Sequence, residues 1–329
     1  MNLSKRRILV TGSAGFVGSH LVERLLRAGA VVRAFVRYTS VHRWSYLDGL
    51  PQELRAGLEV VAGDLRDLSA VRQAVEGCEV VFHLGALVGI PYSYLHPLEV
   101  VETNTLGTLH VLLAARDQHV DKFIHTSTSE VYGTAERVPI AEDHPLKGQS
   151  PYSASKIGAE KIAESFAAAY DLPVVVLRPF NIYGPRQSAR AVIPTIITQA
   201  LTRGFVRLGN LETTRDFTYV EDTVSAFVGA AEADGATGAV MNVGSGQEIS
   251  IGDLARKVFT LLGRPADVRV ESARLRPKGS EVMRLLADSS RSRALIGWNP
   301  VWTLDQGLET TIEWIGAHLD AYDVDRYEI

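Results

Sequence analysis

Thr11-Gly12-Ser13-Ala14-Gly15-Phe16-Val17-Gly18 is the segment from which the fold of this chain can be inferred first. It follows a short β-branched run, residues 7–11, and opens into residues 16–27, where apolar side chains recur at intervals of three and four. The glycines remove side chains where a backbone must approach phosphates, and a helix N-terminus supplies free N–H groups and the positive end of its dipole. Strand, turn and helix in this order predict a turn that binds the pyrophosphate of a dinucleotide. The residues expected to bind it are Gly12, Gly15, Phe16, Val17 and Gly18.

The alternation of strand and helix patterns continues through the first half of the chain. Short runs rich in β-branched residues predict strands, and longer segments with a three-and-four period predict helices. Strands that alternate with helices form parallel sheets, so we predict an α/β fold with a doubly wound parallel sheet of the Rossmann type. Further strands are expected at residues 30–36, 58–62, 80–84, 123–127 and 174–177, and the long helices at residues 98–118 and 153–170.

The pattern becomes mixed after residue 180, where Pro and Gly interrupt the chain. A length of 329 residues also exceeds what one small core requires. We therefore predict a dinucleotide-binding Rossmann domain at residues 1–180 and a smaller mixed α/β domain, mainly substrate-binding, at residues 181–329. Segments around residues 215–245 are expected to return to the first domain. Helices of the second part are expected near residues 192–203, 250–262 and 304–319.

The composition excludes several classes of protein. A net charge of -4 argues against nucleic acid as a partner, since neutralising phosphates requires a basic surface. The chain has one cysteine, Cys78, no run of 18 apolar residues and no signal-peptide pattern, so we expect a cytoplasmic protein that does not enter a membrane. The nine histidines have no metal-ligand spacing, and no metal is expected.

The end of the second strand indicates which dinucleotide is bound. An acidic residue about 20 positions after the glycines would accept a hydrogen bond from the ribose 2′-hydroxyl of NAD, but the chain reads Phe35-Val36-Arg37-Tyr38 there. Arg37 could pair with the 2′-phosphate of NADP, which favours NADP slightly over NAD. A solvated loop charge is the alternative for Arg37. Asp64 and Leu65, after the third strand, are placed to meet the adenine ring.

Tyr152 and Lys156 are separated by four residues at the start of a predicted helix, which puts both on one face. A phenol has a pKa near 10, so about 4 kcal/mol is needed for it to act as a base near neutral pH. An ammonium at about 4 Å supplies about that much at an effective dielectric constant of 20. The pair by itself is also common on helix surfaces, but after a dinucleotide turn it predicts a tyrosine base assisted by a lysine.

The chain resembles extended short-chain dehydrogenases/reductases of the nucleotide-sugar epimerase and dehydratase group. Beyond the glycine turn, the resemblance rests on motifs that follow one another in order along almost the whole chain. They are GDL at 63–65, HLGA at 83–86, NTLG at 104–107, TSTSEVYG at 126–133, YSASK at 152–156, RPFN at 178–181, RDFTYVED at 215–222 and NVGSG at 242–246. The segment at 184–194 resembles that of dehydratases acting on nucleotide-linked N-acetylglucosamine.

The resemblance implies roles for several residues. Tyr152 and Lys156 would serve hydride transfer at the sugar, next to the nicotinamide. The two long helices resemble those through which relatives dimerise, so we expect a homodimer. Leu84, Ala86 and Pro179 are expected beside the cofactor. The residues expected to bind the nucleotide-sugar substrate are Ser93, Asn181, Arg190, Arg215 and Arg276.

The segment Ser127-Thr128-Ser129-Glu130 bears on the reaction. A 4-epimerase only removes and returns a hydride, whereas a 4,6-dehydratase also needs a base for the C5 proton and usually an acid for the C6 hydroxyl. Glu130 supplies a base, and Thr128 would hydrogen-bond O4. Similar dehydratases carry an aspartate where this chain has Ser129, which leaves the acid unassigned. Either Glu130 returns the proton it took, or a water held by Ser129 relays one.

We therefore predict an NAD(P)-dependent 4,6-dehydratase of UDP-N-acetylglucosamine. The alternatives are a nucleotide-sugar 4-epimerase and, from another class, an NADP-binding regulatory protein without catalysis. The Ser-Glu pair also occurs in sugar-nucleotide decarboxylases, whose tyrosine motif differs from the one found here. A structural role for the Glu130 carboxylate is the remaining alternative at that position.

Overall fold

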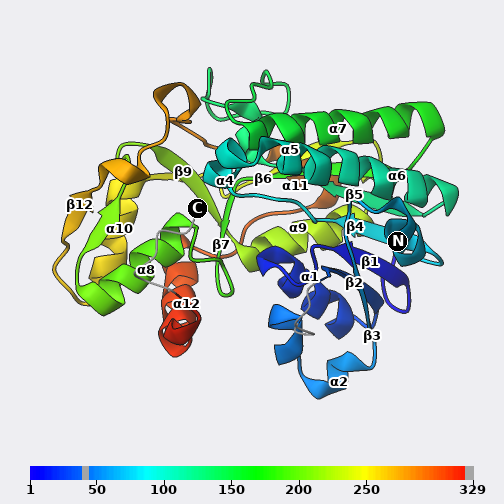
Figure 1. The fold of residues 1–329 in the computed structure, drawn as a ribbon, viewed down its shortest axis with the longest axis horizontal. Coiled ribbons are helices and arrows are strands. Elements are labelled where there is room, and N and C mark those ends of the chain that lie inside the picture. The colour runs from blue at the N-terminus through cyan, green and yellow to red at the C-terminus, as the bar shows by residue number, and fades with distance from the viewer. Residues whose placement is uncertain (39–43, 323–329) are drawn as a thin grey trace.

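The computed structural model describes residues 1–38 and 44–322 and contains a seven-stranded parallel sheet in the order β10-β6-β5-β4-β1-β2-β3 (Figure 1). The predicted doubly wound α/β sheet is confirmed. The order reverses at β1, which pairs with β2 on one side and β4 on the other, and ligands of such sheets bind at this reversal. The strands are β1 Arg7–Thr11, β2 Val31–Arg37, β3 Leu58–Gly63, β4 Val80–His83, β5 Lys122–Thr126, β6 Val174–Pro179 and β10 Val240–Val243.

Helices cover both faces of this sheet because successive strand residues point to opposite sides. Val10 packs with Leu21 of α1 (Phe16–Arg27) and Phe227 of α9 (Val220–Glu232) in one core. Its neighbour Leu9 packs with residues of α3 (Leu68–Val75), α6 (Gly107–Asp117) and α7 (Pro151–Tyr170) in a second core. In Figure 1, α6 and α7 lie above the sheet, and α1 and α9 lie below it.

The helix expected at residues 98–118 is present, with one irregular turn inside it. It consists of α5 (Pro97–Val101), a π-helical turn at Glu102–Leu106 and α6. The wide turn carries Asn104, whose side chain bonds both backbone groups of Leu87 and the hydroxyl of Ser155 on α7. Apolar spacing could not reveal this change, because the hydrogen bonds that accompany it are tertiary.

Two small sheets lie on the other side of the molecule, at the left of Figure 1. Between two strands of one small sheet the chain returns to the large sheet, where β10 pairs in parallel with β6. The division into domains at residue 180 stays a prediction, and residues 323–329 of the second predicted domain lie outside the described residues. The small sheets contain β7 Asn181–Tyr183, β9 Thr214–Tyr219 and β11 Glu248–Ser250, and β8 Val206–Leu208 with β12 Val268–Val270. The remaining α-helices are α2 Gln52–Arg55, α4 Ile90–Leu95, α8 Val192–Arg203, α10 Ile251–Leu261, α11 Ser290–Ile296 and α12 Leu304–Ala317.

The loop after β7 is held against α1 by two polar contacts. His20 Nε2 donates to the Pro185 oxygen over 3.0 Å, and Arg186 pairs with Glu23 at 2.8 Å. Arg186 therefore links two parts of the fold in this structure. Within the described ranges, no helix combines the length and apolarity needed to cross a bilayer.

Candidate active site

The predicted site residues of the large sheet lie at its carboxyl edge. The parallel strands all end there, so residues far apart in the chain come together. The glycine turn follows β1, Arg37 ends β2, and Asp64 and Leu65 follow β3. Leu84 and Ala86 follow β4, Thr128 to Glu130 follow β5, and Pro179 ends β6.

The glycine turn is shaped so that side chains would not fit. Gly12 has a φ of 68°, and a Cβ there would lie 2.9 Å from the backbone of Gly85. A Cβ on Gly18 would lie 2.1 Å from the Gly12 oxygen. No side chain caps α1 at Gly15, so an anion could bind the first turn of the helix. These residues fit the pyrophosphate of a dinucleotide.

Arg37 is paired in this structure. Its Nη2 lies 3.3 Å from Glu99 Oε1 on α5, although its side chain is 62% exposed. A 2′-phosphate would have to compete with Glu99 for this guanidinium. Asp64 is held by Arg66 at 2.7 Å, and the hydrogen bond from Arg66 lowers the pKa of Asp64 to about 2.

His83, at the end of β4, is buried and bonded on both ring nitrogens. Thr108 donates to the Asn104 oxygen, so it accepts from His83 Nε2; Thr11 accepts from Gly85 N, so it donates to His83 Nδ1. Burial lowers the pKa of His83 to about 3, and the imidazole is therefore neutral. The neutral ring joins the end of β1 to α6.

Tyr152 and Lys156 lie in the first two turns of α7. Ser150 caps this helix in a reciprocal pair of hydrogen bonds with Ser153, which fixes where the helix begins. Lys156 Nζ donates to the Thr126 oxygen over 2.6 Å. Burial lowers the pKa of Lys156 to about 8, against the opposing effect of Glu160.

The expected fall in the pKa of Tyr152 is not found. Burial raises it to about 12, a hydrogen bond with Thr128 lowers it, and the charge of Glu130 raises it. The physical reason is that Tyr152 and Lys156 are both removed from water, and Lys156 is directed at the Thr126 oxygen.

Thr128, Ser129 and Glu130 follow β5 and lead into a short 3-10 helix, Ser129–Tyr132. Thr128 Oγ1 accepts from the Glu130 amide at 3.2 Å and also hydrogen-bonds Tyr152. The Glu130 carboxylate is half-buried, and its charge acts on both Tyr152 and Arg215. The Glu130 carboxylate therefore lies within electrostatic reach of both Tyr152 and Arg215.

Unpartnered polar atoms mark the predicted substrate region. Asn181 Oδ1 and Arg276 Nη1 are buried without a hydrogen-bond partner among the described residues. Glu281 Oε1 lies 3.9 Å from both Arg215 Nη2 and Arg276 Nη1. The sequence reasoning missed Glu281. Its chain position offered no signal, because only the fold brings it between these two arginines.

Ser93 and Arg190 are less directly placed. Ser93 is buried on α4, and its hydroxyl donates to the Ile90 oxygen at 2.7 Å, so it could only accept a bond from a substrate. Arg190 is exposed in the loop before α8, and its charge acts on the phenol of Tyr92.

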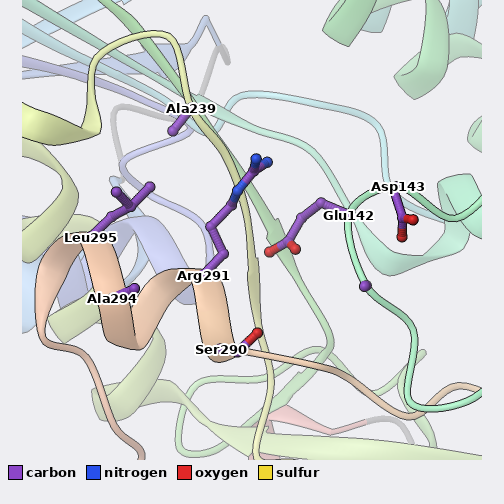
Figure 2. Close-up of a pocket in the computed structure, with 8 residues that line it drawn as sticks. Glu142, Asp143, Ala239, Ser290, Arg291, Ala294 and Leu295 are labelled. Atoms are coloured by element: carbon purple, nitrogen blue, oxygen red, sulfur yellow. The ribbon is translucent and has the colours of Figure 1, made fainter.

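The hollow in Figure 2 lies elsewhere, at the β10 edge of the large sheet. It has a volume of about 740 Å³ and contains none of the predicted site residues. Two of its lining residues bond the edge strand: Glu142 accepts from the Asn242 amide, and Arg291 donates to the Val240 oxygen. These contacts cover backbone groups that an edge strand would otherwise expose.

Comparison with known proteins identifies the family. The model of the GDP-mannose 4,6-dehydratase family matches residues 9–311. The chain belongs to this family. The UDP-glucose 4-epimerase of Mycolicibacterium smegmatis is 34% identical over 318 residues, which cover 93% of this chain and 97% of that protein.

Solved structures support the same assignment. The dTDP-glucose 4,6-dehydratase DesIV of Streptomyces venezuelae, solved with NAD bound, is 29% identical, with a TM-score of 0.86 over 96% of this chain and 99% of that one. The UDP-N-acetylglucosamine 4-epimerase of Methanobrevibacter ruminantium is 30% identical, with a TM-score of 0.87 over 96% and 99%. The family belongs to the extended short-chain dehydrogenases/reductases. The relatives named here include both epimerases and dehydratases. These relatives support an enzyme and not a binding protein without chemistry.

Proposed function

We propose that this protein is a nucleotide-sugar 4,6-dehydratase, with UDP-N-acetylglucosamine as its substrate. The observation that carries the proposal is the location of Glu130, whose charge acts on the phenol of Tyr152 and on the guanidinium of Arg215. A sugar held between the tyrosine base and a diphosphate-binding arginine would meet this carboxylate. A 4-epimerase does not need a carboxylate there.

The residues divide the reaction between them. Tyr152 would accept the O4 proton as its phenolate while C4 is oxidised to a ketone, and Thr128 would orient O4 by a hydrogen bond. A bound nicotinamide would take up the C4 hydride and return it to C6. The 4-ketone acidifies the C5 proton, which Glu130 removes. One water leaves from C6, C6 becomes a methyl group as the hydride returns, and C5 takes up a proton from solvent in place of the one it lost.

The departing C6 hydroxyl needs a proton, and no aspartate precedes Glu130. Ser129 is buried next to Glu130 in the chain, and its hydroxyl would hold a water. We propose that the proton is returned by Glu130, directly or through such a water. Glu130 would then act first as a base and afterwards as an acid.

The nucleotide would be bound by Arg215, Arg276 and Asn181. Arginine suits a diphosphate because its planar fork makes two charge-assisted hydrogen bonds. Arg276 Nη1 and Asn181 Oδ1 support this, since both are buried without a hydrogen bond to another described residue, which is rare for polar atoms. N-acetylglucosamine as the sugar is supported by the segment at 184–194 and by the name of the epimerase from Methanobrevibacter ruminantium.

For the cofactor, we propose NADP over NAD, with Arg37 on the 2′-phosphate. Relatives solved with a cofactor contain NAD, and Arg37 is paired with Glu99 in this structure, so the preference depends on whether a phosphate displaces that carboxylate. The cytoplasmic location remains a prediction from the sequence.

We also propose a homodimer formed through α5, α6 and α7. Leu95, Leu98 and Val101 are exposed at or near α5, and Tyr170 is exposed at the end of α7. A group of exposed apolar side chains on neighbouring helices is typical of a surface that another protein covers. A second copy of this chain is the occupant we propose.

The proposal is tested by incubating the protein with UDP-, GDP- and dTDP-linked hexoses, with and without added NAD or NADP. Mass spectrometry should find that UDP-N-acetylglucosamine loses one water. No product of unchanged mass should form. Loss of water from a different nucleotide sugar would correct the substrate. Conversion without loss of mass would contradict the dehydratase.

A 4-epimerase is the second candidate, and Ser129 is the observation that favours it. Elimination normally requires an acid besides the base, and the residue next to Glu130 cannot donate a proton with comparable strength. An epimerase would give a product of unchanged mass with inverted C4.

A further inference from the structure

Glu160 and Arg178 form a buried ion pair next to the candidate active site. Glu160 lies on α7, one turn after Lys156, and Arg178 is the second-last residue of β6. Arg178 Nε donates to Glu160 Oε2 at 3.0 Å, and its Nη2 donates to Glu160 Oε1. Their side chains are 0% and 3% exposed, respectively. A buried pair adds little stability by itself because desolvation offsets the attraction, so its contacts are more informative than its charge.

The pair contacts both ends of one segment. Ser127 Oγ donates to Glu160 Oε2 at 2.5 Å, and Arg178 Nη1 donates to the Tyr132 hydroxyl at 2.8 Å. Ser127 and Tyr132 enclose residues 128–131, which include the proposed base. The segment is therefore attached to the catalytic helix at its beginning and to β6 at its end.

The hydrogen bonds extend beyond the ion pair, and each donor has an acceptor. The Tyr132 hydroxyl accepts from Arg178 and donates to Asn242 Oδ1 at 2.6 Å. Arg178 Nη1 also donates to the backbone oxygen of Glu142 at 3.1 Å. The Arg178 guanidinium lies over the Tyr132 ring, 4.9 Å from the ring centroid. A network in which every member is satisfied allows one arrangement of its side chains.

We propose that the Glu160–Arg178 pair is a positioning element, which holds Thr128 and Glu130 in place relative to Tyr152 and Lys156. Glu160 is on the same helix as the tyrosine and lysine, so the pair connects the two halves of the proposed chemistry. This inference rests on the proposed function, since a reaction at Thr128 and Glu130 needs them fixed to within about 0.5 Å. In this scheme Glu160 and Arg178 do not touch the substrate. They act through Ser127 and Tyr132.

Two variants test the proposal without removing a buried charge, Ser127→Ala and Tyr132→Phe. Each should lower kcat about 10-fold or more, because a displacement of about 1 Å costs up to about 100-fold. KM for the nucleotide sugar should stay near that of the wild type, since Arg215 and Arg276 are untouched. Reduced nicotinamide should accumulate in both variants, because the Glu130 step slows more than the Tyr152 step. Thr311→Val is the matched control, since it removes a buried hydroxyl from α12 far from this network.

Hydrogen exchange provides a readout that does not need activity. In holoenzyme with Ser127→Ala, the amides of residues 127–132 should exchange faster than in the wild type, while those of α7 should not. Unchanged exchange in both variants overturns the proposal, whatever reaction the protein catalyses. Faster exchange with unchanged kcat also overturns it, because the segment would then need no positioning. A wild-type protein that dehydrates no nucleotide sugar would instead refute the proposed function, and the exchange data would still decide whether the pair holds the segment.

Discussion

Lys156 Nζ on α7 donates a 2.6 Å hydrogen bond to the backbone oxygen of Thr126, the last residue of β5. This bond connects the catalytic helix to the strand from which Thr128 and Glu130 continue. The bond also directs the ammonium toward the sheet. Burial lowers the pKa of Lys156 to about 8. The same side chain therefore joins the helix that carries Tyr152 to the end of β5.

Tyr152→Phe should abolish turnover and leave cofactor affinity unchanged. The substitution removes the hydroxyl that accepts the O4 proton, while the buried ring keeps its packing. A loss of about 100-fold or more is typical when a general base is removed. Steady-state rates and cofactor titration measure the two effects. Tyr183→Phe is the control, a buried tyrosine whose hydroxyl donates to the Leu304 oxygen. A near-normal rate in Tyr152→Phe would show that another group is the base.

Glu130→Gln should still allow hydride removal from C4, because Tyr152 and Lys156 carry that step. Glutamine keeps the shape of glutamate but has no basic oxygen, so reduced nicotinamide should accumulate and water should not be lost. In solvent deuterium, wild-type product should gain one deuterium at C5, whereas the variant should return substrate without exchange. Mass spectrometry and absorbance follow both. Water release at the wild-type rate would assign the base to another residue.

Arg37→Ala should weaken the binding of NADP more than that of NAD, because only NADP has a 2′-phosphate. The difference should be that of a charge-assisted hydrogen bond, about 1.5 to 3 kcal/mol. Glu99→Gln should have the opposite effect and strengthen NADP binding, since Glu99 competes for Arg37 in this structure. Calorimetric titration of both cofactors checks this. Equal changes for NAD and NADP would leave Arg37 without a role in cofactor choice.

The stability of the protein should fall as the pH is lowered from about 6.5 toward 4, and His20 should account for part of this. Burial lowers the pKa of His20 from 6.5 to about 4. Between these values the unfolded chain binds a proton that the folded chain does not, so the contribution is complete above pH 6.5 and is lost as the pH falls. At pH 5 the loss is about 2 kcal/mol.

His20→Gln should reduce this pH dependence, measured as the difference in urea midpoint between pH 7 and pH 5. His83 and His125, whose pKa values burial also lowers, remain in the variant, so the difference between the two proteins isolates His20. His96→Gln, at an exposed histidine, is the control and should leave the slope unchanged. An unaltered slope in His20→Gln would contradict the argument.

The protein should behave in light scattering as a dimer of 35.9 kDa chains at micromolar concentration. Leu98→Asp should shift it to the monomer, because a charge would be placed on a residue that is 70% exposed in the single chain and covered in the dimer. Val301→Asp changes a residue that is 78% exposed, away from α5, and should have no effect. A monomeric wild type would refute the interface, since a stable one buries above about 1,200 Å².

The order of the elements followed from local patterns in the chain. The glycine turn, the β-branched runs and the helical periods each depend on residues close in sequence, so they correctly predicted the large parallel sheet. Sequence patterns could also place Tyr152 and Lys156 on one helix face, because a spacing of four is a local property. The π-helical turn at Glu102–Leu106 was not predicted, since the bonds of Asn104 to Leu87 and Ser155 are not local.

The environment of each charged group was decided by tertiary structure. Arg37 meets Glu99, Glu281 lies between Arg215 and Arg276, and the phenol of Tyr152 is raised in pKa instead of lowered. Burial and the distances between charges determine these outcomes, and both arise only when distant segments pack together. The residue types could therefore be identified from the sequence, whereas their partners and protonation depend on the folded chain.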